Sequence, residues 1–255
     1  MPEPIPNLAG LRVLLTRPAE HSAAWREAFA AAGATVIVHP TVEVVPPPSW
    51  EALDEAFSRL PEYDWLLFTS AAAARFSLAR LPVDPRTLGR PRVAAVGAET
   101  ARVIEDHGVR VALIPELQHQ EGLVAALGEL RPGTRVLFPQ ALGGREGLRD
   151  ALLARGCIVD VVPASQTIAR RDLPAPPPFD VATFASPSAL RAFVAAHGLP
   201  PLQEVAVAVI GPTTGAAATA LGLRPIVALT PSAEGLIRSL ADAGLPVLTK
   251  PQGAA

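Results

Sequence analysis

The sequence is poor in sulfur and in lysine. Its 255 residues include a single cysteine, Cys157, a single methionine and a single lysine, Lys250. One cysteine excludes an intramolecular disulfide and every metal site that is built from several thiolates. The apolar residues around it in "RGCIVDVV" predict that Cys157 is a small buried side chain.

Long apolar runs and an excess of one charge sign are also missing. No stretch approaches the roughly 18 apolar residues of a membrane span, and residues 1–10 lack the basic start and apolar core of a signal peptide. The formal net charge is −2, and the basic residues are scattered rather than gathered into a stripe that nucleic acid would attract. We therefore expect a cytoplasmic protein without membrane or nucleic-acid partners.

What the sequence does contain is a series of short apolar runs separated by helical stretches. Because the runs are continuous rather than alternating, they predict strands that are buried on both faces of a parallel sheet. The helical stretches between them close on glycines that suit helix ends. Strand alternating with helix predicts an open α/β sheet. The apolar runs occupy residues 11–16, 34–40, 64–70, 92–97, 135–139, 158–163, 180–186 and 205–211.

The sequence also repeats itself. The stretch "FTSAAAARF" at residues 68–76 returns as "FASPSALRAF" at residues 184–193, and an aspartate lies six residues before the serine in each. The glycines of "GAET" and "GPTT", and an "EGL" triplet after each, extend the match. The repeat predicts two copies of one unit, roughly 11–130 and 134–245.

A repeat alone does not decide which segments pack together. Each of two sheets could use consecutive sequence, or the two copies could exchange their first strand–helix–strand pieces. Proline-rich segments at 44–50 and 172–179 are stiff spacers. They mark the places where the chain would cross or hinge.

Hydroxyl and glycine residues follow several of the expected strands. In open α/β sheets, ligands collect at the carboxyl ends of the strands, where helix amino termini present unpaired N–H groups. Each serine or threonine there could simply cap its helix, but several junctions together favour an anion-binding surface. Arg17 follows the first strand and could hold a carboxylate through two hydrogen bonds, or lie on the surface. Asp64 and Asp180 begin strands at the opposite end, and we interpret both as structural.

Signatures of familiar catalytic sites are missing. The sequence has no G-x-S-x-G turn, no P-loop and no complete G-x-G-x-x-G. His107 and His197 each precede a glycine that ends an expected helix, where the helix dipole explains them. His39 and His119 are less clearly structural. No pair of histidines has the spacing of metal ligands, so we predict no metal site.

With these motifs assembled, the sequence resembles the uroporphyrinogen-III synthases, enzymes of tetrapyrrole biosynthesis that work without a cofactor. Each motif alone is weak, but they occur in the right order along nearly the whole chain. The matching segments include "RVLLTRPAEHSAAWREAFAAAGATVIVHP", "LLFTSAAAARF", "VAAVGAETARVIEDHGV", "RVLFPQALGGREGLRDALLARGCIVDVVP", "FASPSALRAF" and "VAVIGPTTGAAATALGL".

The resemblance implies a fold and a domain division. It implies two flavodoxin-like parallel-sheet domains that are related by internal duplication and joined by a two-stranded linker. The first domain would combine residues 1–40 with 168–255, and the second would contain residues 41–167.

The resemblance also implies an activity. The protein would be a cofactor-independent lyase that cyclises hydroxymethylbilane, with inversion of the terminal pyrrole ring, to uroporphyrinogen III and water. The substrate is a linear tetrapyrrole with carboxylates on every ring, and it closes unaided to the wrong isomer. The enzyme would therefore act mainly by positioning. We expect a monomer.

Nine residues are candidates for contacts with this substrate. The family's hydroxyl positions carry over to Ser70, Ser186, Ser188, Thr213 and Thr214, and its "TRP"-like motif carries over to Arg17. The remaining candidates head or precede helices at the same strand ends. They are Thr69, Gly97 and Gly211.

One feature of the family is absent. After a strand of the second copy, its members usually carry a tyrosine that is thought to assist departure of the hydroxyl. Here the stretch reads "PASQT", and Ser165 stands in the place of the tyrosine. The only tyrosine is Tyr63, and no catalytic residue can be assigned. Two alternatives therefore stay open: a non-enzymatic two-domain binding protein for a carboxylated ligand, and a nucleotide-dependent Rossmann enzyme. The missing phosphate fingerprint disfavours the second.

Overall fold

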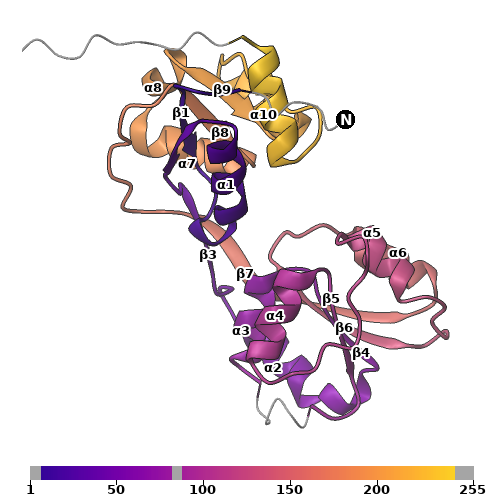
Figure 1. Ribbon diagram of the computed structural model, residues 1–255. Coiled ribbons are helices and arrows are strands. Elements are labelled where there is room, and N and C mark those ends of the chain that lie inside the picture. Colours follow the sequence, from indigo (N-terminus) through magenta and orange to yellow (C-terminus); the bar gives the residue numbers. More distant parts are fainter. Residues whose placement is uncertain (1–6, 82–87, 245–255) are drawn as a thin grey trace, which may run out of the picture. The chain divides into compact units, whose positions relative to one another are not determined.

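The computed structural model describes residues 7–81 and 88–244. Contacts within the chain divide it into two compact units, one formed by Met1–Glu43 with Ile168–Ala255 and the other by Val44–Thr167 (Figure 1). We call them unit 1 and unit 2. Each contributes a five-stranded sheet, and all strand pairs with a described register are parallel. No helix in the described ranges is long and apolar enough to cross a membrane.

The sheet of unit 1 has the strand order β10-β9-β8-β1-β2. When the five strands are numbered along the chain and the sheet is read from β2 to β10, this order is 2-1-3-4-5. That order is common in doubly wound α/β sheets. The strands are β1 (Arg12–Leu15), β2 (Thr35–Val38), β8 (Val181–Phe184), β9 (Ala206–Val209) and β10 (Ile226–Val227).

The sheet of unit 2 has the order β3-β7-β6-β4-β5. Its strands are β3 (Val42–Val45), β4 (Trp65–Phe68), β5 (Arg92–Ala95), β6 (Arg135–Ala141) and β7 (Ile158–Ala169). A parallel bridge from Ala94 to Leu113 adds one further contact at the β5 edge. The chain passes from unit 1 to unit 2 within β3 and returns near the end of β7.

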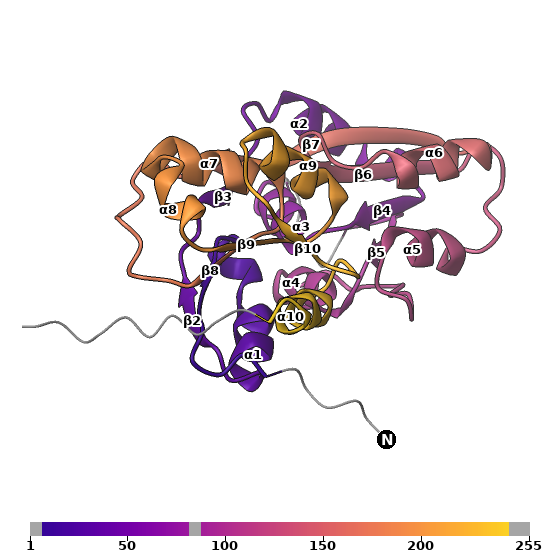
Figure 2. The same cartoon turned by 90° about the horizontal axis from the view of Figure 1, so that it is seen from above.

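Helices cover both faces of each sheet. Those of unit 1 are η1 (Ala19–His21), α1 (Ala23–Ala31), α7 (Pro187–His197), α8 (Pro200–Gln203), α9 (Pro212–Ala220) and α10 (Ala233–Asp242). Those of unit 2 are α2 (Glu51–Ser58), η2 (Leu60–Glu62), α3 (Ala71–Leu78), α4 (Ala98–Asp106), α5 (Gln120–Ala126) and α6 (Gly147–Ala154). Figure 2 shows α1 beside α10 and α7 beside α9, and both pairs are in contact.

Alternate residues of the central strands pack into different cores. In unit 1, Val13 and Leu15 face the core that contains Phe29 of α1, whereas Leu14 faces the core that contains Phe193 of α7. All three strand residues are fully buried. A strand enclosed on both faces must be apolar at every position, so the continuous apolar runs predicted this arrangement correctly.

An aspartate holds the amino edge of each sheet together. Asp180 accepts a hydrogen bond from the Arg12 backbone N–H at 2.8 Å and binds the Arg12 guanidinium at 2.9 and 2.7 Å. Asp64 accepts from the Arg135 backbone N–H at 2.9 Å and from the Arg90 guanidinium at 2.6 Å. These bonds, with the Arg135 backbone bond first, lower the pKa of Asp64. The structural interpretation of both aspartates is confirmed.

Candidate functional site

The carboxyl edge of the unit 1 sheet carries a series of strand-to-helix junctions. Strands β1, β8 and β9 are neighbours and parallel, so their carboxyl ends lie at one edge. Six of the nine candidate residues follow these three strands, and they are Arg17, Ser186, Ser188, Gly211, Thr213 and Thr214.

Ser186 caps the amino terminus of α7. Its Oγ accepts a hydrogen bond from the Ala189 N–H at 3.2 Å and lies 2.9 Å from the Oγ of the exposed Ser188. The cap satisfies one of the N–H groups that a helix start leaves without a partner. The structure therefore gives Ser186 a capping role and leaves Ser188 accessible at the same corner.

The amino terminus of α9 has no side-chain cap among the described residues. Gly211 has an extended backbone there, with open space where a side chain would begin. Pro212 occupies the first turn, which suits it because it lacks an N–H. Thr213 is exposed, whereas the Thr214 side chain is buried. The backbone N–H groups of this turn are thus better placed than the Thr214 hydroxyl to meet a ligand.

Arg17 lies at the wall of a cavity of about 370 Å³. Its guanidinium carbon sits 4.2 Å from the centroid of the Trp25 ring, a cation–π arrangement. The Arg17 Nε is buried and has no hydrogen-bond partner in the described part of the chain, and burial lowers the pKa of the side chain. The cavity is lined by Arg17, Ala24, Trp25, Ile210, Pro231, Ser232, Ala233 and Glu234.

An unpaired, partly desolvated guanidinium is unfavourable by itself. A buried donor without a partner costs about 1–3 kcal/mol, and an anion in the cavity would supply the missing acceptor. Ser232 caps α10 at this cavity by accepting a hydrogen bond from the Gly235 N–H at 3.0 Å, so a helix amino terminus faces the same space. The exposed Glu234 is the acidic member of the lining. The arrangement can bind one carboxylate.

Unit 2 repeats the serine cap at its own carboxyl edge. Ser70 follows β4 and accepts a hydrogen bond from the Ala73 N–H at 3.1 Å at the start of α3. Thr69, directly before it, is half-buried. Both candidates lie at the end of the strand where the sequence placed them.

The amino terminus of α4 is covered by a side chain that sequence reasoning missed. The Gln118 Oε1 accepts a hydrogen bond from the Ala98 N–H at 3.0 Å. A Cβ on Gly97 would lie 2.5 Å from the same oxygen, so a larger residue there would displace the end of the Gln118 side chain. No local pattern indicates this contact, because the two partners are 20 residues apart. Gln118 holds an amide oxygen where a ligand's carboxylate oxygen could bind.

His119 proves to be a helix cap. Its Nδ1 lies 3.1 Å from the Gly122 N–H, which donates to it at the start of α5, and 3.0 Å from a carboxylate oxygen of Glu121. The described residues contain no group of three or more His, Cys, Asp or Glu side chains that could hold a metal ion.

Neither Ser165 nor Tyr63 stands in for the missing family tyrosine. Ser165 pairs with Ala141 at the carboxyl end of β6, but it is buried and its Oγ has no hydrogen-bond partner among the described residues. Tyr63 precedes β4 at the opposite edge, where its hydroxyl donates to Asp160 at 2.5 Å. Burial, followed by this hydrogen bond, raises the pKa of Tyr63. Its proton is therefore held tightly and away from the candidate edge.

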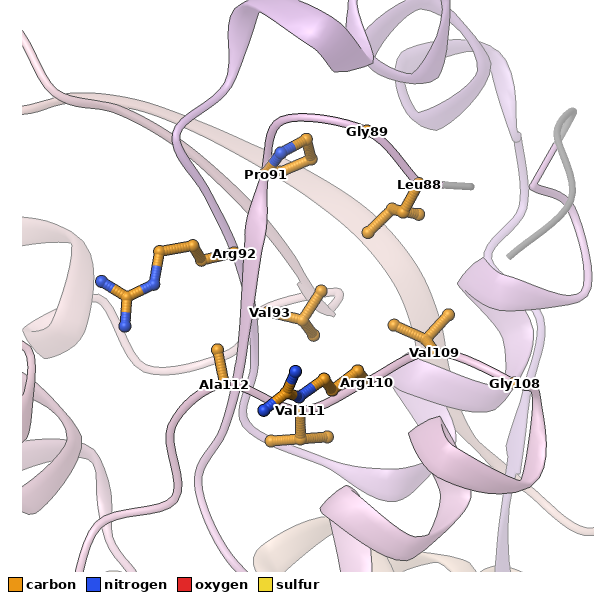
Figure 3. Close-up of a pocket in the computed structure, with 10 residues that line it drawn as sticks. All are labelled: Leu88, Gly89, Pro91, Arg92, Val93, Gly108, Val109, Arg110, Val111 and Ala112. Atoms are coloured by element: carbon orange, nitrogen blue, oxygen red, sulfur yellow. The ribbon is translucent and has the colours of Figure 1, made fainter. Parts of the chain in front are cut away.

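Two further cavities lie at the amino edges of the sheets, one in each unit. In unit 2 a hollow of about 520 Å³ lies beside the start of β5, where Leu88, Val93 and Val109 point toward one another (Figure 3). In unit 1 a cavity of about 630 Å³ is lined in part by Arg12 and Asp180. Because both lie opposite the strand ends that carry the nine candidates, neither contains any of them.

Comparisons with known proteins identify a family. Residues 23–238 match the family model described as uroporphyrinogen-III synthase HemD. A uroporphyrinogen-III synthase of Synechococcus elongatus is 36% identical over 170 residues, with 66% of this chain and 64% of that protein covered. A porphyrin biosynthesis protein HemD of Ruminiclostridium josui is 27% identical over 254 residues, with 93% of this chain and 49% of that protein covered. The chain thus spans less than two thirds of the length of either relative.

A solved structure shares the fold. The crystal structure of uroporphyrinogen-III synthetase from Helicobacter pylori 26695 aligns with a TM-score of 0.58 at 20% identity, covering 91% of this chain and 99% of that chain. At this identity the likeness concerns the fold alone, a mixed α/β fold with two mainly parallel sheets.

Proposed function

Because the chain belongs to the uroporphyrinogen-III synthase family, we propose that it cyclises hydroxymethylbilane to uroporphyrinogen III and water, inverting the terminal ring. The observation that carries the proposal is the family match, which extends over residues 23–238 and so includes both units. The non-enzymatic binding protein considered from the sequence gains no support from the comparisons.

The residues proposed to contact the substrate lie at the carboxyl edge of the sheet in each unit. In unit 1 they are Arg17, Ser186, Ser188, Gly211, Thr213 and Thr214, and in unit 2 they are Thr69, Ser70 and Gly97. Parallel strand ends followed by helix amino termini suit a ligand that carries many carboxylates. Within the described residues, the start of α9 has no side-chain cap and the Arg17 Nε has no hydrogen-bond partner, which makes unit 1 the better anion-binding unit.

Arg17 is proposed to hold one substrate carboxylate. The Arg17 guanidinium carbon lies over the Trp25 ring, 4.2 Å from its centroid. A guanidinium carries N–H donors that suit paired hydrogen bonds to a planar anion. The partly buried setting strengthens these bonds, because water competes less for the same donors. Fixing one carboxylate orients the rest of the linear substrate.

Positioning is proposed to supply most of the catalysis. The substrate closes readily by itself, so the protein must favour closure through the inverted ring over direct closure. Bound carboxylates restrict the approach of the two chain ends, and the terminal hydroxyl leaves as water. We assign no general acid, since Tyr63 is buried at the amino edge and Ser165 is buried without a partner.

The two units are proposed to be domains that arose from one internal duplication. Exchange of the first strand–helix–strand pieces between the copies would give the boundaries 1–40 with 168–255, and 41–167, and contacts within the chain change units close to these positions. The strand orders β2-β1-β8-β9 and β7-β6-β4-β5 support this proposal, because they correspond strand for strand after such an exchange. Strands β3 and β7 would form the two-stranded linker. A cytoplasmic monomer without nucleic-acid or membrane partners stays a prediction.

The test is a direct assay of product type. Purified protein is incubated with freshly made hydroxymethylbilane, and after oxidation the ratio of type III to type I uroporphyrin is measured by chromatography. We expect type III to dominate, whereas buffer alone gives type I. A ratio equal to that of buffer would overturn the proposed activity.

A further inference from the structure

Two histidines that are far apart in the sequence meet inside unit 1. His39 follows β2 and His197 ends α7, and their Nε2 atoms lie 3.2 Å apart across a separation of 158 residues. The ring centroids are 5.3 Å apart. This distance between two imidazole nitrogens is that of an N–H···N hydrogen bond.

Aromatic neighbours surround the pair, in which His39 is buried and His197 is half-buried beside a cavity. Only 6% of His39 is exposed, and Phe193 contacts both imidazoles edge-on, with centroid distances of 6.3 Å to His39 and 4.9 Å to His197. Phe179 packs edge-on against the other side of Phe193. Additional charge on the pair is therefore poorly solvated.

The chemistry of the contact limits how many protons it can hold. A neutral pair needs one imidazole as donor and the other as acceptor at Nε2. One added proton leaves that bond intact, because an imidazolium can still donate to a neutral partner. A second added proton places an N–H on both facing nitrogens and two positive charges side by side. The contact must then open.

The charged groups around the pair do not compensate for this charge. Arg170, on the returning segment, adds positive potential at His39. Arg12 and Asp180, which line the cavity beside His197, are paired with each other, and Glu204 lines the same cavity. Desolvation lowers the pKa of both imidazoles, and the charge of His197 and of Arg170 lowers that of His39 further.

The pair holds residues 39–41, the segment just before the chain passes from unit 1 to unit 2. Two residues after His39, the buried Thr41 donates through Oγ1 to the Ala189 carbonyl of α7 at 2.9 Å. The Thr41 carbonyl accepts from the Arg170 N–H at 3.0 Å. Strand β3 begins at the next residue, Val42. The segment 39–41 is thus tied to α7 by one imidazole contact and one hydroxyl contact.

We propose that the His39–His197 contact is an acid-sensitive clamp that holds segment 39–41 on α7 and releases it when both imidazoles are protonated. The clamp is a property of unit 1 and does not depend on the proposed enzymatic activity. In the released state both side chains reach water and regain the ordinary pKa of histidine, about 6.5. Opening therefore takes up protons below that pH, and the clamp weakens as the pH falls.

Hydrogen–deuterium exchange of the full chain tests the clamp. The measured quantity is the protection factor of peptides that contain residues 39–42, corrected for the intrinsic exchange rate. Between about pH 6.5 and pH 5, this factor should fall by up to about tenfold per pH unit for each proton taken up. His197→Gln retains a side-chain N–H donor for His39 but cannot bring a second charge. It should show a clearly smaller fall.

His107→Gln is the matched control, because His107 also lies at the carboxyl end of a helix, α4, but its ring nitrogen lies 2.7 Å from a backbone oxygen, that of Val103, rather than from a second histidine. It should retain the wild-type pH dependence. Equal pH dependence in the wild type and His197→Gln would overturn the proposal.

Imidazole nitrogen NMR of the wild type provides a test without substitution. It should show one Nε2–H and one Nδ1–H tautomer for this pair at neutral pH. Two Nδ1–H tautomers would also overturn the proposal, because two lone pairs would then face each other.

Discussion

Units 1 and 2 share a serine-capped turn between a strand and a helix, but the helix that follows starts differently in each unit. Ser186 and Ser70 cap α7 and α3 in the same way, each accepting from the N–H three residues later. The following glycine-headed helices differ, since the start of α9 is bare whereas Gln118 covers the start of α4. The shared caps are explained by helix stability alone. The differences are therefore the better guide to where a ligand binds.

The two units also differ in the charge of the side chain near the end of the first strand of each repeat. Arg17 lies five residues after Arg12, which begins β1, and Gln140 lies five residues after Arg135, which begins β6. Unit 1 thus places a partly buried charge where unit 2 has a neutral amide. A duplicated scaffold can specialise in this way because a polar side chain at a strand end changes without disturbing the core.

The largest effect is expected from the two amino-edge aspartates. Asp180→Asn should destabilise unit 1 by about 2–3 kcal/mol, because the buried Asp180 carboxylate accepts hydrogen bonds from the Arg12 backbone and guanidinium, although the Arg12 side chain itself is 34% exposed and stays hydrated. Asp64→Asn should cost unit 2 about 1 kcal/mol, since the Asp64 side chain is 31% exposed and that of Asp180 only 4%. Native-state hydrogen exchange in β8 and β4 measures each unit separately. Equal losses would show that the two edges are energetically alike.

The next effect concerns Arg17. Arg17→Gln gives unit 1 the residue type that unit 2 has at the equivalent position. The KM for hydroxymethylbilane should rise about tenfold to a hundredfold, since hydrogen bonds to a charged group contribute about 1.5–3 kcal/mol. Thermal stability should change little, because the loss of the cation–π contact with Trp25 is offset by removal of the buried Nε, which has no hydrogen-bond partner within the described residues. Arg26→Gln, on the exposed side of α1, is the control. An unchanged KM in the Arg17 variant would remove this residue from the site.

The serine caps should behave alike. Ser70→Ala and Ser186→Ala should each reduce the stability of their unit by about 1 kcal/mol through loss of the cap. Ser188→Ala should leave stability nearly unchanged, because Ser188 is exposed and accepts no helix N–H. Thermal unfolding and steady-state kinetics of the three variants separate capping from substrate contact. A loss of kcat/KM in Ser188→Ala at unchanged stability would identify a substrate contact.

The smallest effect is expected at Gln118. Its Oε1 competes with any ligand for the Ala98 N–H. Gln118→Ala should therefore lower KM about threefold, which corresponds to about 0.6 kcal/mol. The variant should also lose a little stability in α4, because the Ala98 N–H loses its partner. Gln203→Ala, an exposed change at the end of α8, should leave KM unchanged. A raised KM in Gln118→Ala would mean that Gln118 itself contacts the substrate.

The sequence predicted the layers of the fold well. Continuous apolar runs identified eight of the strands, whereas β3 and β10 lie outside these runs. Strand β10 has only two residues, too few for a periodic signal, and β3 lies where only the family resemblance implied a two-stranded linker. The buried state of Cys157 is also confirmed.

The histidines show where sequence reasoning stops. His197 was attributed to the helix dipole, and it does end α7, yet its partner is His39. His119 was unassigned and caps α5. A cap joins residues three apart and can be read from the chain, whereas a contact across 158 residues depends on how β2 and α7 pack.

The sequence by itself determined what short-range physics controls: which residues form buried strands, which serines cap helices and where helices end. Tertiary structure alone decided that Arg17 lies over Trp25, that Gln118 covers the start of α4, and that His39 meets His197. The reason is physical. Apolar periodicity and capping are satisfied within a few residues, but burial of a charge and pairing of polar groups depend on distant segments that only the packed chain brings together.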